Sequence, residues 1–564
     1  MSKTYVVIGG SAAGPKTASK IRRLDQKAKI VMLQKGKHLS MASCGYPYFV
    51  GGVFDDPNML ISTPTGAQRD PTFFSNVKDI TALTSTEALS VDRENKCVKA
   101  RNLETGETFD QPYDRLMIAT GANAIVPNLP GRELEGVTTL QSMEDAVYLK
   151  ERLKSGELRR AVIVGGGLIG IETCEALELA GVQITVVEML DQVLSFLDWE
   201  MAKLVENHIR EKGSDVITGT AVSEFIGQDG KLTGVRLSDG RELECDLAVV
   251  AIGVRPNSKL AREAGLKIGD TGGISVNTFM QTSDPDIFAA GDCVETTNLV
   301  THEKAHWPMG DAANLQGRVA AQNMVLGNVV AFPGMVGTGI CKVFDLAAGS
   351  TGLSEQRAKR LGYANILTAI HAAPDKPGFM GAKPVTIKLV ADKTTCRLLG
   401  MQAVGSGDVS KRVAIGAMAI YARMCVGDMV NLDLPYAPPF SSAIDSFIAA
   451  AHVLQNKCLG RMQGISSVQL KAKLDAGERP YLLDVRGKDE FEAMRLGIGE
   501  SLIPLGALRK SVDQLPSDKN TEIIVYCKIS LRGYEAACFL SSLGYTRVLV
   551  MEGGILAWPF AREK

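Results

Sequence analysis

The segment AVIVGGGLIG at residues 161–170 runs from four apolar residues into a glycine-rich turn. A helical stretch follows, and then a second apolar run at 184–187 that ends at Glu188. A strand, a Gly-x-Gly-x-x-Gly turn, a helix and a further strand make up the βαβ unit that binds dinucleotides. The segment therefore predicts one such unit in this part of the chain.

The spacing of the glycines indicates how a dinucleotide would be held. Gly165 permits the tight turn, Gly167 lets the backbone approach a pyrophosphate, and Gly170 lets the helix pack closely on the strand. The helix N-terminus then presents free N–H groups to the phosphates. Glu188 stands where a carboxylate binds a ribose 2′-hydroxyl, and it would repel a 2′-phosphate. The pattern therefore predicts NADH rather than NADPH.

The same plan occurs near the N-terminus with two departures. An apolar run at 5–8 leads into GGSAAG at 9–14, and a second apolar run follows at 30–33. Ser11 replaces the second glycine of the pattern, and Gln34 stands where an acidic residue is usual. Taken alone, this turn would be weak support for a second dinucleotide.

Three later stretches strengthen the case for FAD at the first turn. Residues 283–292 resemble the second FAD signature of flavoproteins with two dinucleotide domains, a strand ending in Gly-Asp whose aspartate contacts the ribityl chain. Residues 119–122 and 251–257 resemble the two crossover segments of that architecture. The residues that this resemblance assigns to cofactor binding are Gly9, Ser11, Gly14, Gln34, Lys35, Ala119, Thr120, Gly121, Gly253 and Asp292.

Composition sets limits on the remaining possibilities. At 564 residues, 45% apolar and 22% charged, the chain resembles an ordinary globular protein of about four domains. A net charge of -1 gives no general attraction to nucleic acid or an anionic membrane, and we expect neither as a partner. The eleven cysteines show no repeated spacing and no CxxC pair, which argues against a disulfide framework and a metal site. A first strand near Thr4 and the lack of a long apolar run favour a cytoplasmic location.

The stretch SMASCGYPY at residues 40–48 carries the chemistry of the first half. In the two-dinucleotide architecture this position lies beside the flavin ring. A glutathione-reductase-like Cys-x4-Cys pair would need a second cysteine at position 49, which is Phe49, so Cys44 stands alone. A single thiolate can attack a disulfide or persulfide and hold one sulfur as a mixed disulfide. Alternatively it can cycle through sulfenic acid, as in peroxide reduction.

Residues 1 to about 450 resemble the single-cysteine flavoprotein disulfide reductases, specifically the coenzyme A-disulfide reductases. The segments that carry this resemblance are Ser40–Tyr48, KVFD at 342–345, TGL at 351–353 and YAPPFS at 436–441. The resemblance implies a homodimer in which the loop of Tyr436 reaches the partner's redox cysteine, with a role such as proton donor. The alternative is a tyrosine that only packs.

The resemblance also implies a coenzyme A site, with coenzyme A as substrate or as a resident thiol. Its contacts map onto Arg23, Ser40, Ser43 and Lys78, the basic pair facing the phosphates. Ser43 differs from the family, which commonly has asparagine there. Residues 371–378 lack the tyrosine pair that family members often carry. Both differences concern the substrate pocket rather than the reaction type.

The last hundred residues form a separate segment. YLLDVR at 481–486 predicts a strand closing in Asp-x-Arg, and a buried strand at 522–526 leads into CKISLR at 527–532 and a helix. Backbone N–H groups of such a loop point at the cysteine sulfur, and with Arg532 they favour a thiolate and stabilise a bound persulfide. The segment resembles the rhodanese family throughout, including EGG at 552–554 and Trp558.

The length of that loop separates two activities. Four residues lie between Cys527 and Arg532, the rhodanese spacing, whereas phosphatases of related fold have five. Ser530 replaces the glycine often found in the rhodanese loop. A degenerate, non-catalytic rhodanese domain is the alternative.

The sequence thus predicts an α/β protein with two Rossmann-like dinucleotide-binding domains, a mixed α/β dimerisation domain and a rhodanese-like α/β domain. The expected boundaries are 1–142 with 254–325 for FAD, 143–253 for NADH, 326–455 for dimerisation, 456–466 for a linker and 467–564 for the rhodanese-like domain. The expected activity is NADH-dependent reduction of sulfur–sulfur bonds in small persulfides, polysulfides or disulfides. The alternatives are an NADH oxidase or peroxidase, disfavoured because the first glycine turn lacks a histidine, and a non-enzymatic redox or sulfur-relay protein.

Overall fold

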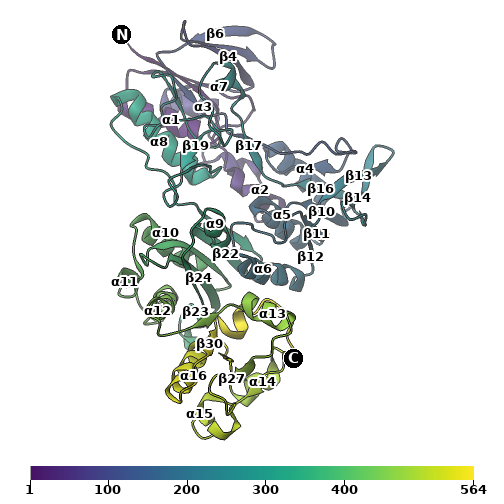
Figure 1. The fold of residues 1–564 in the computed structure, drawn as a ribbon. Coiled ribbons are helices and arrows are strands. Elements are labelled where there is room, and N and C mark those ends of the chain that lie inside the picture. The colour runs from purple at the N-terminus through teal and green to yellow at the C-terminus, as the bar shows by residue number, and fades with distance from the viewer. Residues whose placement is uncertain (1, 564) are drawn as a thin grey trace. The chain divides into compact units, whose positions relative to one another are not determined.

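The computed structural model describes residues 2–563 (Figure 1). The chain divides into two compact units. The first extends to Met189 and resumes from Thr220 to Met335, and the second comprises Leu190–Gly219 and the chain from Val336 onward.

The first unit contains a five-stranded parallel sheet in the order β18-β7-β1-β2-β3. Its elements and the helices that follow its strands are β1 Thr4–Ile8, α1 Ala13–Leu24, β2 Lys29–Leu33, α3 Pro71–Lys78, β3 Thr81–Leu83, β7 Arg115–Ile118, β18 Ile287–Ala289 and α8 Gly310–Leu326. The central strands are runs of buried apolar residues, as expected of a parallel sheet covered on both faces. The strand β18 pairs with β7, and its Ile287 lies opposite Leu116, so two distant parts of the chain complete one sheet.

The two crossover segments pair with each other. Strand β8, Ala122–Ala124, runs antiparallel to β17, Val254–Pro256. Thr120 Oγ1 donates a hydrogen bond to the carbonyl oxygen of Asn257 at 2.7 Å. The chain therefore leaves and re-enters the first sheet through one two-stranded ribbon.

A second parallel arrangement in the first unit has the order β11-β10-β16-β9. Its elements are β9 Val137–Thr138, α4 Met143–Lys154, β10 Arg160–Val164, α5 Leu168–Leu179, β11 Gln183–Glu188 and β16 Leu247–Val250. Because β9 pairs with β16, this sheet begins before the expected boundary at residue 143. A two-residue strand carries no sequence periodicity, so the sequence alone favours a boundary at the following helix.

The second unit contains a five-stranded antiparallel sheet in the order β21-β22-β25-β24-β23. Its strands and helices are α6 Trp199–Glu211, β21 Thr338–Val343, β22 Leu346–Gly352, α9 Glu355–Arg360, β23 Ile366–Pro374, β24 Pro384–Asp392, β25 Leu398–Gly405, α10 Val409–Tyr421, α11 Val426–Met429 and α12 Ser446–Cys458. Helix α12 continues to Cys458 and β26 begins at Gly464, so the irregular connection is shorter than the expected 456–466 linker.

A buried lysine joins α6 and α9 to this sheet. The Lys388 side chain, 1% exposed, lies 2.9 Å from Asp198 Oδ2, 2.5 Å from Glu200 Oε1 and 2.7 Å from Glu355 Oε2. A charge so deeply buried is tolerated only when it is paired. The pairing explains why residues 190–219 belong with the second unit.

The C-terminal part of the second unit is a parallel sheet in the order β26-β30-β29-β27-β28. Its elements are β26 Gly464–Ile465, α13 Ser467–Asp475, β27 Tyr481–Asp484, α14 Lys488–Ala493, β28 Ser501–Leu502, α15 Leu505–Leu508, β29 Ile523–Tyr526, α16 Leu531–Ser542 and β30 Val548–Met551. Separate apolar clusters cover its two faces. The predicted α/β fold class, with two dinucleotide-binding domains, a mixed domain and a rhodanese-like domain, is confirmed.

Glu552 docks this sheet onto the antiparallel one. Its side chain is buried, its Oε2 accepts a hydrogen bond from the N–H of Ile370 at 2.9 Å, and its Oε1 pairs with Lys457. Glu552 directly follows β30, whereas Ile370 lies in β23 and Lys457 in α12. One buried carboxylate therefore links three elements of the second unit.

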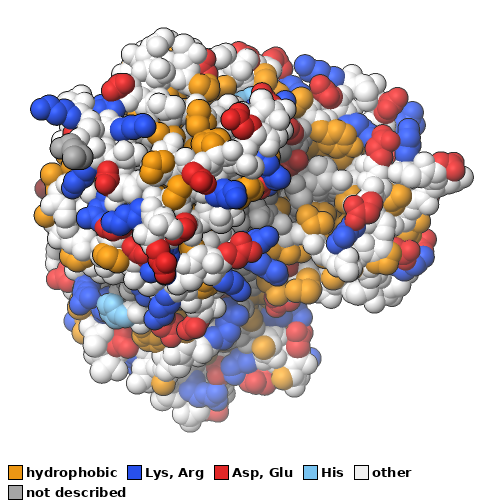
Figure 2. Space-filling view, turned by 90° about the horizontal axis from the view of Figure 1, so that it is seen from above, with side chains coloured by type: hydrophobic (Ala, Val, Ile, Leu, Met, Phe, Trp, Pro, Cys, Tyr) orange, Lys and Arg blue, Asp and Glu red, His pale blue; other side chains and the backbone are white. Residues whose placement is uncertain are grey.

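Three further observations concern the surface charge, the helices and possible metal ligands. Basic and acidic side chains are interspersed on the face shown in Figure 2, in keeping with the net charge of -1. Across residues 2–563, none of the helices has both the length and the apolar character needed to cross a bilayer. The same residues contain no cluster of three or more His, Cys, Asp or Glu side chains suited to a metal ion.

Candidate active site

The two predicted glycine turns have matching geometry. A Cβ added to Gly14 would lie 1.8 Å from Gly9 O, and one added to Gly170 would lie 2.0 Å from Gly165 O. Any larger residue at these positions would push the helix away from the turn. Helices α1 and α5 both start without a side-chain cap, so their first N–H groups remain available to an anion. Both turns therefore fit the pyrophosphate of a dinucleotide.

The side chains at the ends of β2 and β11 repeat the same contact. Gln34 Oε1 accepts a hydrogen bond from Gly10 N at 2.7 Å, and Glu188 Oε2 accepts one from Gly166 N at 2.7 Å. Each side chain is thereby fixed beside its glycine turn, where a ribose is bound in this fold. Ser11 is exposed at the first turn. Lys35 is also exposed, and it pairs with Glu87 at 2.9 Å.

The segment after β18 is held beside these turns. Gly291 N donates to Gln316 Oε1 at 2.8 Å, and His306 Nε2 lies 2.8 Å from the carbonyl oxygen of Asp292. Burial raises the pKa of the Asp292 carboxyl. Ala119 and Gly121 lie on the neighbouring crossover, and Gly253 lies on the opposite one. The residues assigned to FAD thus come together from four distant stretches, although Gln316 and His306 carried no sequence signal.

Cys44 lies in a short 3-10 turn, Ser43–Gly45, that leads directly into α2, Tyr46–Val50. The thiol is exposed in the chain, whereas Tyr46 and Phe49 beside it are buried. Packing is tight behind the turn, since a Cβ on Gly45 would lie 2.3 Å from Leu60 Cδ2. The turn therefore presents the Cys44 side chain on a tightly packed support.

Although Cys44 keeps an exposed surface, its sulfur is partly shielded and three carboxylates act on it electrostatically. Burial raises the pKa of Cys44, and Glu172, Asp292 and Asp311 raise it further. Burial also raises the pKa of Glu172 to about 7, against a hydrogen bond from Tyr48 that lowers it. The protein's own side chains thus favour the neutral thiol, and Glu172 can exchange a proton near neutral pH. Sequence reasoning missed Glu172, which lies only four residues beyond Leu168 on α5.

The four residues assigned to coenzyme A occupy neighbouring structures. Ser43 is exposed beside Cys44, and Arg69 Nη1 donates to the Ser40 carbonyl oxygen at 3.3 Å. Arg23 lies in the last turn of α1, and Lys78 is the last residue of α3. The buried Arg22 joins these two helix ends, because its Nε donates to the carbonyl oxygen of Lys78 at 3.1 Å. That contact, which sequence reasoning did not foresee, brings the two cationic residues onto adjoining helix ends.

Tyr436 lies in an irregular segment of the second unit between α11 and α12. Its side chain is 57% exposed, and Phe440 and Ile444 in the same segment are 70% and 54% exposed. Large apolar side chains exposed together are typical of a surface that meets another protein.

Cys527 directly follows β29 and is completely buried. The loop to α16 closes at Ser530, whose φ of +84° lies in the left-handed region that favours glycine. Ser530 also donates to the carbonyl oxygen of Met551 at 3.3 Å, and Ile555 N donates to the carbonyl oxygen of Cys527 at 3.0 Å. The loop therefore keeps its shape without the glycine that rhodaneses often have.

Arg532 is held against Cys527 by a second residue. Glu490 accepts hydrogen bonds from Arg532 Nη1 at 2.6 Å and Nη2 at 2.8 Å, a bidentate pair. This contact lowers the pKa of Glu490 to about 2. The hydrogen bonds to Glu490 raise the pKa of Arg532, and the neighbouring Cys527 raises it further. Sequence reasoning missed Glu490, which follows the Asp484-x-Arg486 strand end by a few residues.

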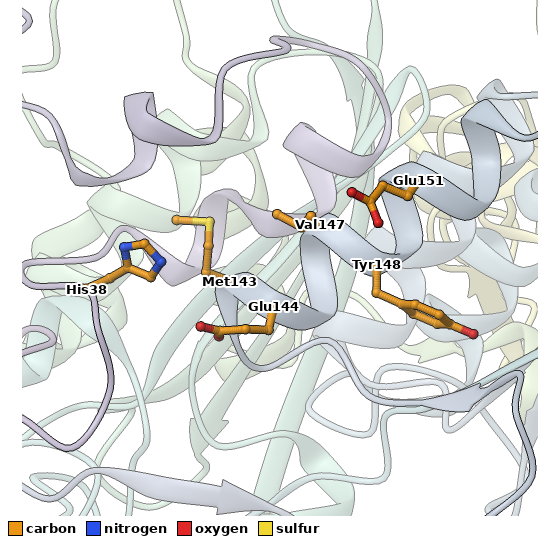
Figure 3. A pocket seen from close by; sticks show the side chains of 6 residues that line it. All are labelled: His38, Met143, Glu144, Val147, Tyr148 and Glu151. Carbon is orange, nitrogen blue, oxygen red and sulfur yellow. The ribbon is translucent and has the colours of Figure 1, made fainter. Parts of the chain in front are cut away.

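A separate shallow pocket contains none of these groups. Figure 3 shows it between α4 and the loop that carries His38. Its lining residues are His38, Met143, Glu144, Val147, Tyr148 and Glu151. It offers neither a thiol nor a glycine turn.

Fold and site together define a class of protein: an enzyme with two dinucleotide-binding domains, one redox cysteine and an appended rhodanese-like domain. Family models match accordingly. Residues 3–309 match the pyridine nucleotide-disulphide oxidoreductases, 338–447 the dimerisation domain of that family and 466–560 the rhodanese-like domain. The chain belongs to the pyridine nucleotide-disulphide oxidoreductase family, whose members bind FAD and NAD(P)H.

Three known proteins illustrate the similarity. The structure of a NAD-dependent persulfide reductase from A. fulgidus matches with a TM-score of 0.93 and 43% identity, covering 98% of this chain and 100% of that one. The NAD(P)H coenzyme A polysulfide/persulfide reductase of Pyrococcus horikoshii is 34% identical over 81% of this chain and 99% of its own length. An NADH oxidase of Methanocaldococcus jannaschii is 34% identical over 79% of this chain and 97% of its own length.

Proposed function

We propose that this chain is an NADH-dependent flavoprotein that reduces the sulfur–sulfur bonds of coenzyme A persulfide, polysulfide or coenzyme A disulfide. The observation that carries the proposal is the union, in one chain, of an exposed lone thiol at Cys44 and a rhodanese loop at Cys527. The names of the A. fulgidus and P. horikoshii relatives support it. Glu188 beside the second glycine turn supports NADH over NADPH.

The bound cofactors would supply a pair of electrons, taken from the nicotinamide and made available beside Cys44. Cys44 would attack one sulfur of the substrate and release the other half as a thiolate or sulfide. Glu172, whose pKa burial raises to about 7, would accept the thiol proton. Tyr436 from the partner subunit would protonate the leaving sulfur.

Coenzyme A would bind near Cys44 as a substrate half or as a resident thiol. Arg23 and Lys78 would face its phosphates, because Arg22 holds their helix ends together. Ser40 and Ser43 would contact the arm that reaches Cys44. The exposed segment around Tyr436 supports a homodimer.

Cys527 would carry sulfane sulfur as a persulfide. The Arg532 guanidinium, fixed by Glu490, would stabilise the negative charge of that sulfur. The expected location is the cytoplasm, where reduced thiols persist.

One experiment tests the reaction. Steady-state NADH oxidation is measured against coenzyme A disulfide, coenzyme A persulfide, polysulfide, peroxide and oxygen. We expect the highest kcat/KM on persulfide or polysulfide. The second candidate, an NADH oxidase, rests on the M. jannaschii relative. Faster turnover with oxygen or peroxide than with any sulfur compound would favour it and reject our proposal.

A variant separates the two sulfur sites. Cys527→Ser should abolish sulfur transfer from thiosulfate to cyanide and sharply reduce activity on polymeric or protein-bound sulfur. Reduction of coenzyme A disulfide should stay nearly unchanged, since that substrate can reach Cys44 without a carrier. Equal losses on small and bulky substrates would mean that Cys527 acts through structure.

A further inference from the structure

Two cysteines outside the active site lie in contact. Cys396 Sγ is 3.4 Å from Cys458 Sγ, although 62 positions separate them in the chain. Both are half-buried, so a small molecule can reach them. A disulfide requires a sulfur–sulfur distance of about 2.05 Å, so the gap to be closed is about 1.4 Å. A modest adjustment of the side chains is enough.

The turn that carries Cys396 is fixed independently of this contact. Asp392 Oδ1 accepts hydrogen bonds from Thr394 N at 3.0 Å and Thr395 N at 2.7 Å. Cys396 itself has φ of +54°, a conformation that non-glycine residues adopt only when the surrounding structure requires it. Val426 N then donates to the Cys396 carbonyl oxygen at 2.8 Å. The thiol is therefore held facing the end of α12.

Cys458 is the last residue of α12, and its location ties the pair to the rhodanese-like domain. The preceding residue, Lys457, pairs with the buried Glu552, which also receives the N–H of Ile370. A bond from Cys458 to the β24–β25 turn would fix the helix end from which that domain continues.

We propose that Cys396 and Cys458 form a redox-active dithiol that sulfane sulfur oxidises to a disulfide. In the first step a Cys396 thiolate attacks the outer sulfur of a persulfide, RSSH, giving Cys396–S–SH and RSH. In the second step Cys458 Sγ attacks Cys396 Sγ, the bond from Cys396 Sγ to the outer sulfur breaks, and that outer sulfur leaves as hydrogen sulfide. The two thiols lose two electrons and the sulfane sulfur gains them, so that RSSH and two thiols give a disulfide, RSH and hydrogen sulfide.

The order of these steps follows from the environment of Cys458. Burial and the neighbouring Cys396 raise the pKa of Cys458 to about 12. A thiol that remains protonated is a poor first nucleophile, so the first bond forms on Cys396. Two molecules of a small thiol such as coenzyme A restore the dithiol by thiol–disulfide exchange and leave as their own disulfide.

The test uses full-length protein with FAD bound and Cys44→Ser and Cys527→Ser in place, so that neither assigned sulfur centre reacts. The reduced protein is treated, without NADH, with inorganic polysulfide or with diamide, then alkylated and mapped by mass spectrometry. We expect a cross-linked Cys396–Cys458 peptide lacking two hydrogens, and release of about one sulfide per chain in the polysulfide arm. Hydrogen exchange over 456–466 should slow in the oxidised protein.

Matched variants complete the design. Adding Cys396→Ser should abolish both the cross-link and the sulfide release. Adding Cys425→Ser, a half-buried cysteine whose sulfur caps α11, should leave both unchanged. A cross-link with diamide alone would overturn the assignment of sulfane sulfur as oxidant, and no cross-link in either arm would overturn the dithiol itself. Because NADH is absent, these outcomes are independent of whether the proposed reductase activity is correct.

Discussion

The preference for NADH can be tested by removing one charge and almost nothing else. Glu188 Oε2 accepts a hydrogen bond from Gly166 N at 2.7 Å. In the first glycine turn, Gln34 makes the corresponding contact with Gly10 N at the same distance. Gln34 therefore shows what Glu188→Gln should look like: the amide oxygen keeps the hydrogen bond to the glycine turn, and the negative charge is lost.

The size of the effect follows from electrostatics. Two unit charges about 4 Å apart repel by about 1 kcal/mol in water and about 4 kcal/mol near a protein surface. For the half-buried Glu188 facing a 2′-phosphate we expect about 2–3 kcal/mol, or about 30- to 150-fold in kcat/KM. Glu188→Gln should raise kcat/KM for NADPH by most of that factor and lower it for NADH by about 5-fold, since a charge-assisted hydrogen bond to ribose becomes a neutral one.

The assay compares kcat/KM for NADH and NADPH with one sulfur substrate at low and high salt. The effect on NADPH should shrink at high salt, because the interacting charges are partly exposed. Glu178→Gln, at the opposite end of α5, removes a carboxylate far from the glycine turn and should leave the ratio unchanged. An unchanged ratio in Glu188→Gln would refute the reasoning, as would a wild-type enzyme that uses both cofactors equally.

Three further predictions concern sulfur chemistry and stability. Cys44→Ser should abolish reduction of every sulfur substrate while FAD stays bound. The first is measured by NADH oxidation and the second by flavin absorbance. Substantial remaining activity would exclude a role of Cys44 as nucleophile. Lys388→Met should lower the free energy of unfolding by about 3–5 kcal/mol at neutral pH, whereas Lys359→Met, an exposed partner of Glu355, should cost under about 1 kcal/mol in the same denaturant titration. Lys388 and Lys359 lower the pKa of Glu355 to about 2, whereas the ordinary value is 4.5. The stabilisation of the fold by the Lys388–Glu355 pair should therefore be complete above about pH 4.5 and be lost as the pH falls toward 2. A loss of stability in Lys388→Met that does not depend on pH would contradict the pairing. Glu490→Gln should reduce thiosulfate sulfurtransferase activity about tenfold without changing coenzyme A disulfide reduction, and equal activity would show that the arginine needs no support.

The sequence alone was enough to predict those parts of the fold whose conformation is determined by one short segment. The glycine turns, their flanking strands and the Cys527 loop could be predicted because turn geometry and hydrophobic periodicity depend on neighbouring residues. The sequence did not predict contacts between side chains that are far apart in the chain. Glu490 reaches Arg532 from 42 positions away, and Glu552 reaches Ile370 from 182. Nothing near Glu552 in the sequence indicates that its carboxylate is buried.

The extent of the elements was also less predictable than their existence. The polar character of residues 456–466 indicated a linker, yet α12 extends to Cys458 because its apolar face packs against the antiparallel sheet. Strand β9 was missed because two residues carry no periodicity, and only its pairing with β16 defines it. Contacts made after folding, rather than local propensity, decide such ends.

The two assigned cysteines have opposite surroundings, and this difference bears on the order in which they handle sulfur. Cys44 is exposed and lies among carboxylates that raise its pKa, whereas Cys527 is buried beside a guanidinium held in place by Glu490. Under the proposed function, a persulfide anion on Cys527 would lie beside the Arg532 guanidinium, whereas an anion on Cys44 would be opposed by carboxylates. Under the proposed function, Cys527 is therefore suited to store sulfane sulfur, and Cys44 is suited to hold it only as a neutral mixed disulfide that is quickly reduced. The difference between these environments would hold sulfane sulfur on the carrier until reduction at Cys44 removes it, and it would diminish if Arg532 lost its charge.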